Sequence, residues 1–225
     1  MSERPTLYWI NGSIPSWQVM LACHLRGVEY ESRRLKVMGS TRETRSPEFL
    51  AINPRGQAPV WVEPDGTTVC ESMAILHWLE ASRPETSLCP EGPAMALMLQ
   101  RMYEVERLRM AYRPLEALFL QQSSLSSEQI EAARAAPARV AQELSIWSSH
   151  LEEHPWIAGP ALTLADCVFY PALGYQIRRG LILGERWPRL QAYVDRIEAR
   201  PAAREARPLG WHRVGKSLFA RAAAL

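Results

Sequence analysis

The chain has 225 residues, of which 47% are hydrophobic and 22% are charged, a composition typical of one or two globular domains and not of a disordered or fibrous protein. Its 26 basic and 24 acidic residues give a formal net charge of +2, too balanced for a protein that binds nucleic acid by charge alone. No apolar run reaches the roughly 18 residues of a membrane span, and the polar start does not resemble a signal peptide. We therefore expect a cytoplasmic protein that binds neither nucleic acid nor membrane.

The cysteine and histidine patterns do not predict a metal site. The four cysteines are far apart in the sequence and form no Cys-x-x-Cys pair, which favours reduced thiols over a zinc site or a dithiol centre. The run from His150 to His154 matches a His-x-x-Glu-His zinc motif, but Pro155 follows at once. His154 is thus expected at a helix end, where a histidine suits the helix dipole.

The first 35 residues predict a strand, a helix and a second strand. Residues 6–10 are aromatic and β-branched, and the breakers Asn11 and Gly12 follow them. Ser13 is a good helix cap, proline is tolerated in a first helical turn, and Gly27 marks the helix end. Residues 28–35 mix apolar and charged side chains as a strand does.

The next segment predicts a hairpin followed by a helix. A turn signal at residues 53–56 precedes a strand at 59–63, a turn at 64–66 and a returning strand at 67–70. Helical spacing begins at Ser72 and ends near Pro84. The order βαβ-α-ββα over about 80 residues is a thioredoxin-like plan of the α/β class.

Long helical periodicities replace the strand signals from residue 93 onward. Helices are predicted at 93–121, 126–153, 164–178 and 188–199, with capping-box spacing at Ser126 to Gln129 and at Thr163 to Asp166. We predict a thioredoxin-like domain at 1–83, a linker at 84–92 and an all-α helical bundle at 93–225.

Four motifs in this order resemble the cytosolic glutathione S-transferase family, and the resemblance covers nearly the whole chain. Residues 13–16 (Ser-Ile-Pro-Ser) resemble the Ser-x-Pro-Ser turn of its serine-type theta and delta classes. Residues 53–59 resemble the segment that ends in the family's cis-proline, and residues 71–75 resemble the Glu/Gln-Ser-x-Ala-Ile that opens its third helix. Residues 159–171 resemble the buried folding motif of its helical domain.

The resemblance assigns the chemical step to Ser13. A free thiol has a pKa near 8.5, so only a few per cent is thiolate at pH 7. A hydroxyl that donates to the sulfur at a helix N-terminus favours the anion. Tyr8 is the rival, because the tyrosine-type classes use a tyrosine on the first strand.

The resemblance also implies which residues bind glutathione. Ser72 and Glu71 would take the carboxylate and the ammonium of the γ-glutamyl end, since a helix N-terminus suits an anion. The backbone of Ala58, turned outward by a cis bond to Pro59, would pair with the tripeptide as a short added strand. Gln57 would reach the glycyl carboxylate.

The second half is expected to bind the other substrate, because the family places that pocket between its two halves. The candidate residues on the first long helix are Tyr103, Arg107, Arg109, Tyr112 and Arg113. Residues 206–225 carry four basic residues and no acid. Such a tail could fold over the site mouth, as in several serine-type relatives, or simply aid solubility.

The sequence therefore predicts a glutathione transferase that uses glutathione as co-substrate and no metal. It would conjugate glutathione to a small hydrophobic electrophile, a reaction typical of detoxification, and the family implies a homodimer. A glutathione-dependent isomerase is the enzymatic alternative, because residues 13–17 also resemble the Ser-Ser-Cys-Ser-Trp of the maleylacetoacetate-isomerising zeta class, with Pro15 in place of the cysteine. A non-catalytic regulatory protein of the same fold is the other alternative.

Overall fold

The computed structural model describes residues 3–38, 42–120, 125–211 and 217–225. The chain divides into two compact units, one made of Met1–Cys89 with Arg200–Leu209 and the other of Pro90–Ala199 with Gly210–Leu225. The first unit thus extends past the residues 1–83 expected from the sequence. It also includes ten residues that the sequence pattern assigns to the helical domain.

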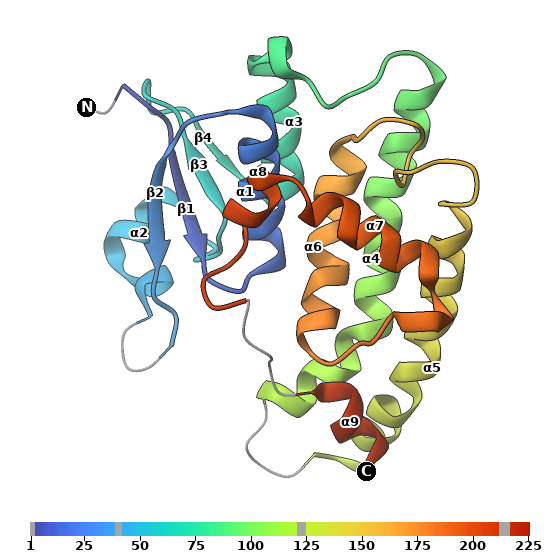
Figure 1. Ribbon diagram of the computed structural model, residues 1–225. Coiled ribbons are helices and arrows are strands. Elements are labelled where there is room, and N and C mark those ends of the chain that lie inside the picture. The colour runs from blue at the N-terminus through green and yellow to red at the C-terminus, as the bar shows by residue number, and fades with distance from the viewer. Residues whose placement is uncertain (1–2, 39–41, 121–124, 212–216) are drawn as a thin grey trace. The chain divides into compact units, whose positions relative to one another are not determined.

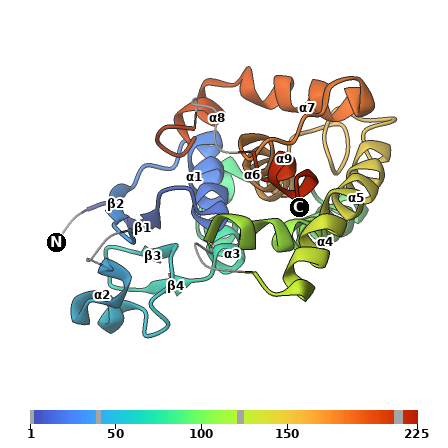
Figure 2. The same ribbon diagram turned by 90° about the horizontal axis from the view of Figure 1, so that it is seen from below.

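A four-stranded mixed sheet forms the centre of the first unit (Figure 1). Its strands β1 (Thr6–Ile10), β2 (Glu31–Leu35), β3 (Val60–Val62) and β4 (Thr68–Cys70) lie in the order β2-β1-β3-β4. β1 pairs with β2 in parallel and with β3 antiparallel, and β3 pairs antiparallel with β4. The helices α1 (Ile14–Arg26) and α3 (Ser72–Ser82) cover one face, and α2 (Pro47–Ile52) lies against the other (Figure 2). The thioredoxin-like plan is confirmed.

Local sequence signals account for the bounds of α1. The Ser13 side chain accepts from the Ser16 N–H at the start, and Gly27 ends the helix with φ 66°. The Gly27 N–H donates to the His24 carbonyl and the Val28 N–H to the Cys23 carbonyl, which satisfies two of the carbonyls at the end of the helix. Because Val28 is committed to this helix end, β2 begins at Glu31 and not at residue 28.

The second unit is helical, as predicted. Its long helix α4 (Pro93–Leu120) packs against α5 (Ser127–Ser149), α6 (Leu164–Arg178) and the short α9 (Leu218–Ala223). α7 (Pro188–Glu198) contacts α5. Three 3-10 turns, at Glu43–Arg45, Pro84–Thr86 and Gly184–Arg186, and the five-residue α8 (Pro201–Glu205) complete the elements of the described chain.

The start of α6 is closed by a buried carboxylate as well as by a capping box. The Asp166 carboxylate is fully buried and accepts from the backbone N–H groups of Ile157 and Thr163 at 3.1 and 2.8 Å. Burial raises the pKa of Asp166 to about 6, although these hydrogen bonds favour its charged form. The capping boxes predicted at Ser126 and at Thr163 are both confirmed.

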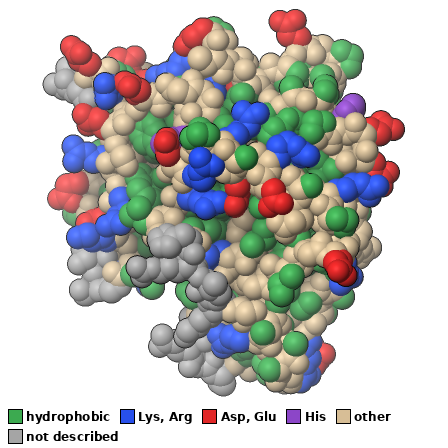
Figure 3. Space-filling model, in the orientation of Figure 1, with side chains coloured by type: hydrophobic (Ala, Val, Ile, Leu, Met, Phe, Trp, Pro, Cys, Tyr) green, Lys and Arg blue, Asp and Glu red, His purple; other side chains and the backbone are tan. Residues whose placement is uncertain are grey.

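The surface matches the balanced composition. Acidic and basic side chains are intermingled with hydrophobic ones on the face drawn in Figure 3. None of the helices in the described residues has the length and hydropathy to cross a membrane.

Candidate active site

The sheet topology brings three of the predicted segments to one edge. β1 leads into Ser13, and β4, which runs in the same direction as β1, leads into Glu71 and Ser72. β3 runs the opposite way, so the Ala58–Pro59 pair that precedes it lies at this same edge. Ser13, Ala58 and Ser72 are therefore gathered by the order and directions of the strands, although 58 residues lie between the first and the last.

Ser13 occupies the N-cap of α1 in a geometry that leaves its proton free. Its Oγ accepts from the Ser16 N–H at 3.3 Å, and its own N–H donates to the Ile10 carbonyl at 3.2 Å. The Ser16 hydroxyl in turn accepts from the Ile10 N–H at 3.2 Å. A hydroxyl that accepts one bond through oxygen can still donate its hydrogen. The capping role of Ser13 and a role as donor to a ligand are thus compatible.

The first turn of α3 has no side-chain cap. Its N-cap residue is Glu71, whose φ of 71° makes it the non-glycine residue of the described chain with a positive φ. A non-glycine residue in such a conformation costs of the order of 1–3 kcal/mol and is concentrated at functional sites. The exposed Glu71 carboxylate makes no hydrogen bond or ion pair with the described residues. Unbonded N–H groups and a free carboxylate stand side by side here.

Gln18, which the sequence analysis did not single out, connects the two helix starts. It lies in the second turn of α1 and is only 4% exposed. The Ser72 hydroxyl donates to its Oε1 at 3.1 Å. A buried amide five residues after Ser13 looks like an ordinary core position in the sequence, so only the packing of α1 against α3 reveals this contact.

The turn before β3 presents an unpaired backbone. The Ala58–Pro59 peptide bond is cis, as predicted. Buried Asn53 holds the turn, because its amide donates to the Gln57 carbonyl at 2.7 Å and its Oδ1 accepts from the Arg55 N–H at 3.1 Å. The N–H and C=O groups of Ala58 have no partner in the part of the chain that the structure describes.

The space beside this turn is tight at one position. Gly56 has φ 61°, and a Cβ there would lie 2.6 Å from the Thr44 carbonyl oxygen. The Gln57 side chain, by contrast, is exposed. The turn therefore requires glycine at position 56 and presents an exposed amide side chain at Gln57.

Tyr8 and Cys70 also lie near this edge of the sheet. The Tyr8 ring packs against Phe49 of α2, with centroids 5.8 Å apart. Burial, and secondarily the Glu71 carboxylate, raise the pKa of the Cys70 thiol. That thiol therefore stays protonated at neutral pH, which disfavours it as a nucleophile. Within the described residues no group of His, Cys, Asp and Glu side chains could hold a metal ion.

The candidate second-substrate residues do not share one surface of α4. Tyr103, 61% exposed, and Arg107 lie one turn apart on its exposed side, as do Arg109 and Arg113. Tyr112 is buried in the helical unit, edge-on to Tyr175 with centroids 5.6 Å apart. Burial raises the pKa of Tyr112, and its hydroxyl has no hydrogen-bond partner among the described residues.

An aromatic cluster around Tyr175 was not predicted. Trp211 lies 5.8 Å from the Tyr175 ring, and Phe219 of α9 lies 6.0 Å from that of Tyr112. The Arg179 guanidinium lies over the Tyr175 ring at 5.3 Å. These residues come from three separate segments, so sequence spacing could not group them. Of the basic tail residues, Arg213 and Lys216 lie outside the described residues.

Comparisons with known proteins match both halves of the chain. The family model "Glutathione S-transferase, N-terminal domain" matches residues 13–82, and "Glutathione S-transferase, C-terminal domain" matches residues 101–201. The first match includes Ser13, Gln57, Ala58, Pro59, Glu71 and Ser72.

Similar proteins extend over nearly the whole chain. Glutathione S-transferase A of Pleuronectes platessa is 31% identical over 219 residues, which is 94% of each chain. A maleylacetoacetate isomerase of Pseudomonas aeruginosa is 28% identical over 209 residues, 90% of this chain and 95% of the relative. A solved glutathione S-transferase of the Antarctic clam Laternula elliptica superposes with a TM-score of 0.84 at 27% identity, covering 96% and 97% of the two chains.

Proposed function

The chain belongs to the glutathione S-transferase family, and we propose that it is a serine-type transferase in which Ser13 activates the glutathione thiol. The observation that carries the proposal is the Ser13 hydroxyl. Its oxygen accepts from the Ser16 N–H at 3.3 Å, so its hydrogen is available to donate to a thiol sulfur. A donor at a helix N-terminus favours the thiolate over the thiol. Lowering the thiol pKa by one to two units is worth roughly 1.4 to 2.7 kcal/mol.

The other glutathione contacts follow from the groups left unpaired at the same edge. The γ-glutamyl carboxylate would accept from the open first turn of α3 at Ser72, and its ammonium would donate to Glu71. The tripeptide backbone would pair with Ala58 next to Pro59, and Gln57 would donate to the glycyl carboxylate. Each of these protein groups offers a hydrogen-bond donor or acceptor that complements the group of the tripeptide it would contact.

Ser13→Ala tests this assignment. It should lower kcat by about tenfold or more, because the thiol loses its donor, and shift the acid limb of the pH–rate profile one to two units upward. Glutathione affinity by calorimetry should change little. Tyr8→Phe is the matched control and should leave the profile unchanged. Full activity of Ser13→Ala with loss in Tyr8→Phe would transfer the role to Tyr8.

We propose a small, mostly apolar electrophile as second substrate. Tyr103 and Arg107 are candidates for its contacts, whereas buried Tyr112 could act only from behind the surface. The aromatic cluster of Tyr112, Tyr175 and Trp211 favours an apolar body. Tyr175→Ala should raise KM for an aryl halide and leave KM for glutathione unchanged. The reverse pattern would place Tyr175 with glutathione.

A glutathione-dependent isomerase is the second candidate, favoured by the similarity to the isomerase of Pseudomonas aeruginosa. Pro15 stands where the zeta-class motif has a cysteine, which favours conjugation. The two reactions differ in one measurement, since a conjugating enzyme consumes glutathione and an isomerase leaves its concentration unchanged. Turnover of maleylacetoacetate with no loss of glutathione would decide for the isomerase.

We further propose a cytoplasmic homodimer with a role in detoxification, as the family resemblance implies. α4 carries the exposed apolar side chains Met95 and Met110, which a second copy could cover. Light scattering should give twice the chain mass of 25.5 kDa. A single chain mass at micromolar concentration would contradict the dimer.

A further inference from the structure

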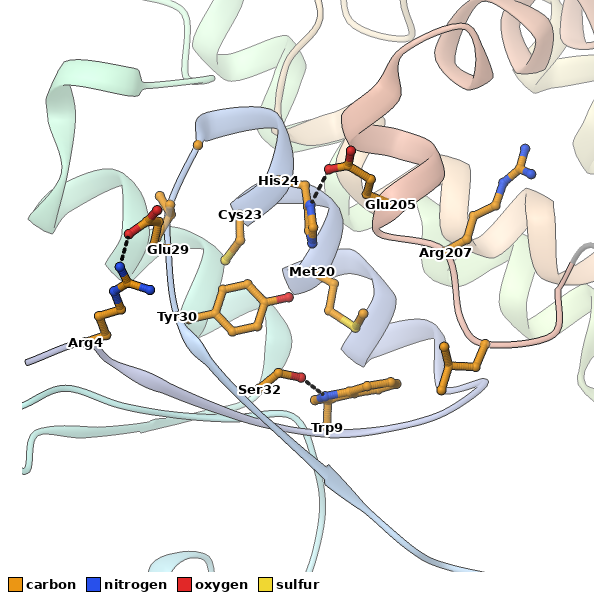
Figure 4. Close-up of a pocket in the computed structure, with 13 residues that line it drawn as sticks. Arg4, Trp9, Met20, Cys23, His24, Glu29, Tyr30, Ser32, Glu205 and Arg207 are labelled. Atoms are coloured by element: carbon orange, nitrogen blue, oxygen red, sulfur yellow. Dashed lines mark hydrogen bonds and ion pairs between the residues drawn. The ribbon is translucent and has the colours of Figure 1, made fainter. Parts of the chain in front are cut away.

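The segment Arg200–Leu209, here called the strap, belongs to the glutathione-binding unit despite its position late in the chain. Its helix α8 lies beside α1 in Figures 1 and 2. Ala203 and Ala206 of the strap are fully buried. Glu205 Oε2 lies 3.5 Å from His24 Nδ1 of α1, a contact drawn in Figure 4. The strap is therefore docked on α1 by both packing and a polar contact.

The far end of the strap contacts a different place, the Asn11 side chain just after β1. The Asn11 Oδ1 accepts from the Leu209 N–H at 2.8 Å, and the Asn11 Nδ2 donates to the Leu209 carbonyl at 3.3 Å. One amide thus satisfies both peptide groups of a residue 198 positions away. Between α8 and this contact, the strap forms one wall of a cleft of about 630 Å³ with β1, β2 and α1. The Asn11 pair therefore links the end of the strap to the residue that directly follows β1, and we call this pair the tether.

The tether is attached to the turn that places Ser13. The Ser13 N–H donates to the Ile10 carbonyl, which makes Asn11 and Gly12 the two central residues of a tight turn, with Gly12 at φ 81°. Ser13 then caps α1 through its Oγ. Rotation of this turn would move the Ser13 Oγ relative to α1, and a hydrogen bond weakens steeply as its angle and length depart from the optimum.

We propose that Asn11 is a positioning residue for Ser13, and that the strap holds the catalytic turn through the backbone of Leu209. This rests on the proposed role of Ser13. Asn11 need not touch glutathione, because it acts on the direction of the Ser13 hydroxyl. Both of its hydrogen bonds are needed, so neither an aspartate nor an apolar side chain replaces it.

Steady-state kinetics with glutathione and an aryl halide give the first test. Asn11→Ala should lower kcat about tenfold, equivalent to about 1.4 kcal/mol, and move the acid limb of the pH–rate profile to higher pH. The calorimetric Kd for glutathione should stay within about twofold. A merely structural role would lower Tm and leave the pH profile unmoved, and that result would overturn the proposal.

Variants of Leu209 separate its backbone from its side chain. Leu209→Pro removes the N–H donor together with the leucine side chain and restrains φ, and it should reproduce part of the kcat loss. Leu209→Ala removes the side chain but keeps both peptide groups, and it should match the wild type. The double variant Asn11→Ala with Leu209→Pro should be no worse than Asn11→Ala alone, since both remove the same contact. Additive losses, or a silent Leu209→Pro, would contradict the tether.

Amide hydrogen exchange tests the tether independently of activity. In Asn11→Ala the Ser13 and Ser16 amides should exchange at least about tenfold faster, and the Trp61 amide in β3 should not change. If the wild type lacks glutathione-dependent activity but these amides lose protection, the proposed function fails and the turn is still held by Asn11. Unchanged protection of Ser13 and Ser16 overturns the proposal.

Discussion

The helices α3 and α6 begin in opposite ways. At the start of α6, the buried Asp166 carboxylate accepts from two backbone N–H groups, and the capping box with Thr163 is complete. At the start of α3, Glu71 has a strained backbone and caps nothing. A helix end that satisfies its own donors stabilises the fold, whereas one that leaves them open can bind an anion. Capping therefore distinguishes the structural helix start from the proposed binding one.

The largest effect should be a loss of stability when the Asp166 carboxylate at the start of α6 is removed. Asp166→Ala leaves buried N–H groups of Ile157 and Thr163 without acceptors, and should lower the free energy of unfolding by about 3–5 kcal/mol. Urea denaturation measures this. Asp195→Ala, at an exposed aspartate of α7, is the control and should cost less than about 0.5 kcal/mol. Equal losses in the two variants would contradict the role of Asp166.

The pH dependence of stability should show the cost of burying Asp166. Its folded pKa of about 6 lies above its ordinary value of 3.8, so the folded state holds the proton more tightly. The stability that this group contributes is full below about pH 4 and falls as the pH rises to about 6, by up to roughly 3 kcal/mol. The advantage of the wild type over Asp166→Asn should shrink across this range. An advantage of the wild type that grows with pH would contradict the prediction, because it would mean that folding lowers the pKa of Asp166.

A substitution at the start of α3 should change glutathione affinity more than it changes stability. Ser72→Ala removes the hydroxyl that bonds Gln18 and stands beside the proposed carboxylate site. We expect the glutathione Kd to rise about tenfold, or about 1.4 kcal/mol, with a small change in Tm. Ser82→Ala, at the other end of α3, is the matched control. Unchanged affinity in Ser72→Ala would remove Ser72 from the site.

The smallest effect should be a gain in stability at Glu71. Glycine adopts a positive φ without the steric cost that glutamate bears, so Glu71→Gly should raise the free energy of unfolding by about 1 kcal/mol. Glutathione affinity should fall, since the carboxylate is lost. Glu71→Gln keeps the strain and removes only the charge. A loss of affinity in Glu71→Gly without one in Glu71→Gln would show that the charge is not used.

Local patterns predicted much of this molecule because their causes are local. The cap at Ser13, the stop at Gly27 and the capping boxes at Ser126 and Thr163 each depend on residues within one helical turn. The bounds of α1, α3, α4, α5, α6 and α7 were accordingly predicted to within a few residues, whereas the short helices α2, α8 and α9 were given no bounds. The early end of α5 at Ser149, against a predicted 153, shows where fraying and the following proline blur such signals.

The sequence by itself determined the order of elements as far as residue 199 and the change from an α/β half to an all-α half, because these depend on local patterns. The residues at the sheet edge were named from the family resemblance, and the strand order and directions that bring them together are tertiary. Tertiary packing alone decided three further things. It placed Tyr112 in the helical core, it brought Gln18 against Ser72, and it returned the strap to Asn11. Each is a contact between segments far apart in the chain, and its free energy depends on the packing of whole elements, which no local pattern records.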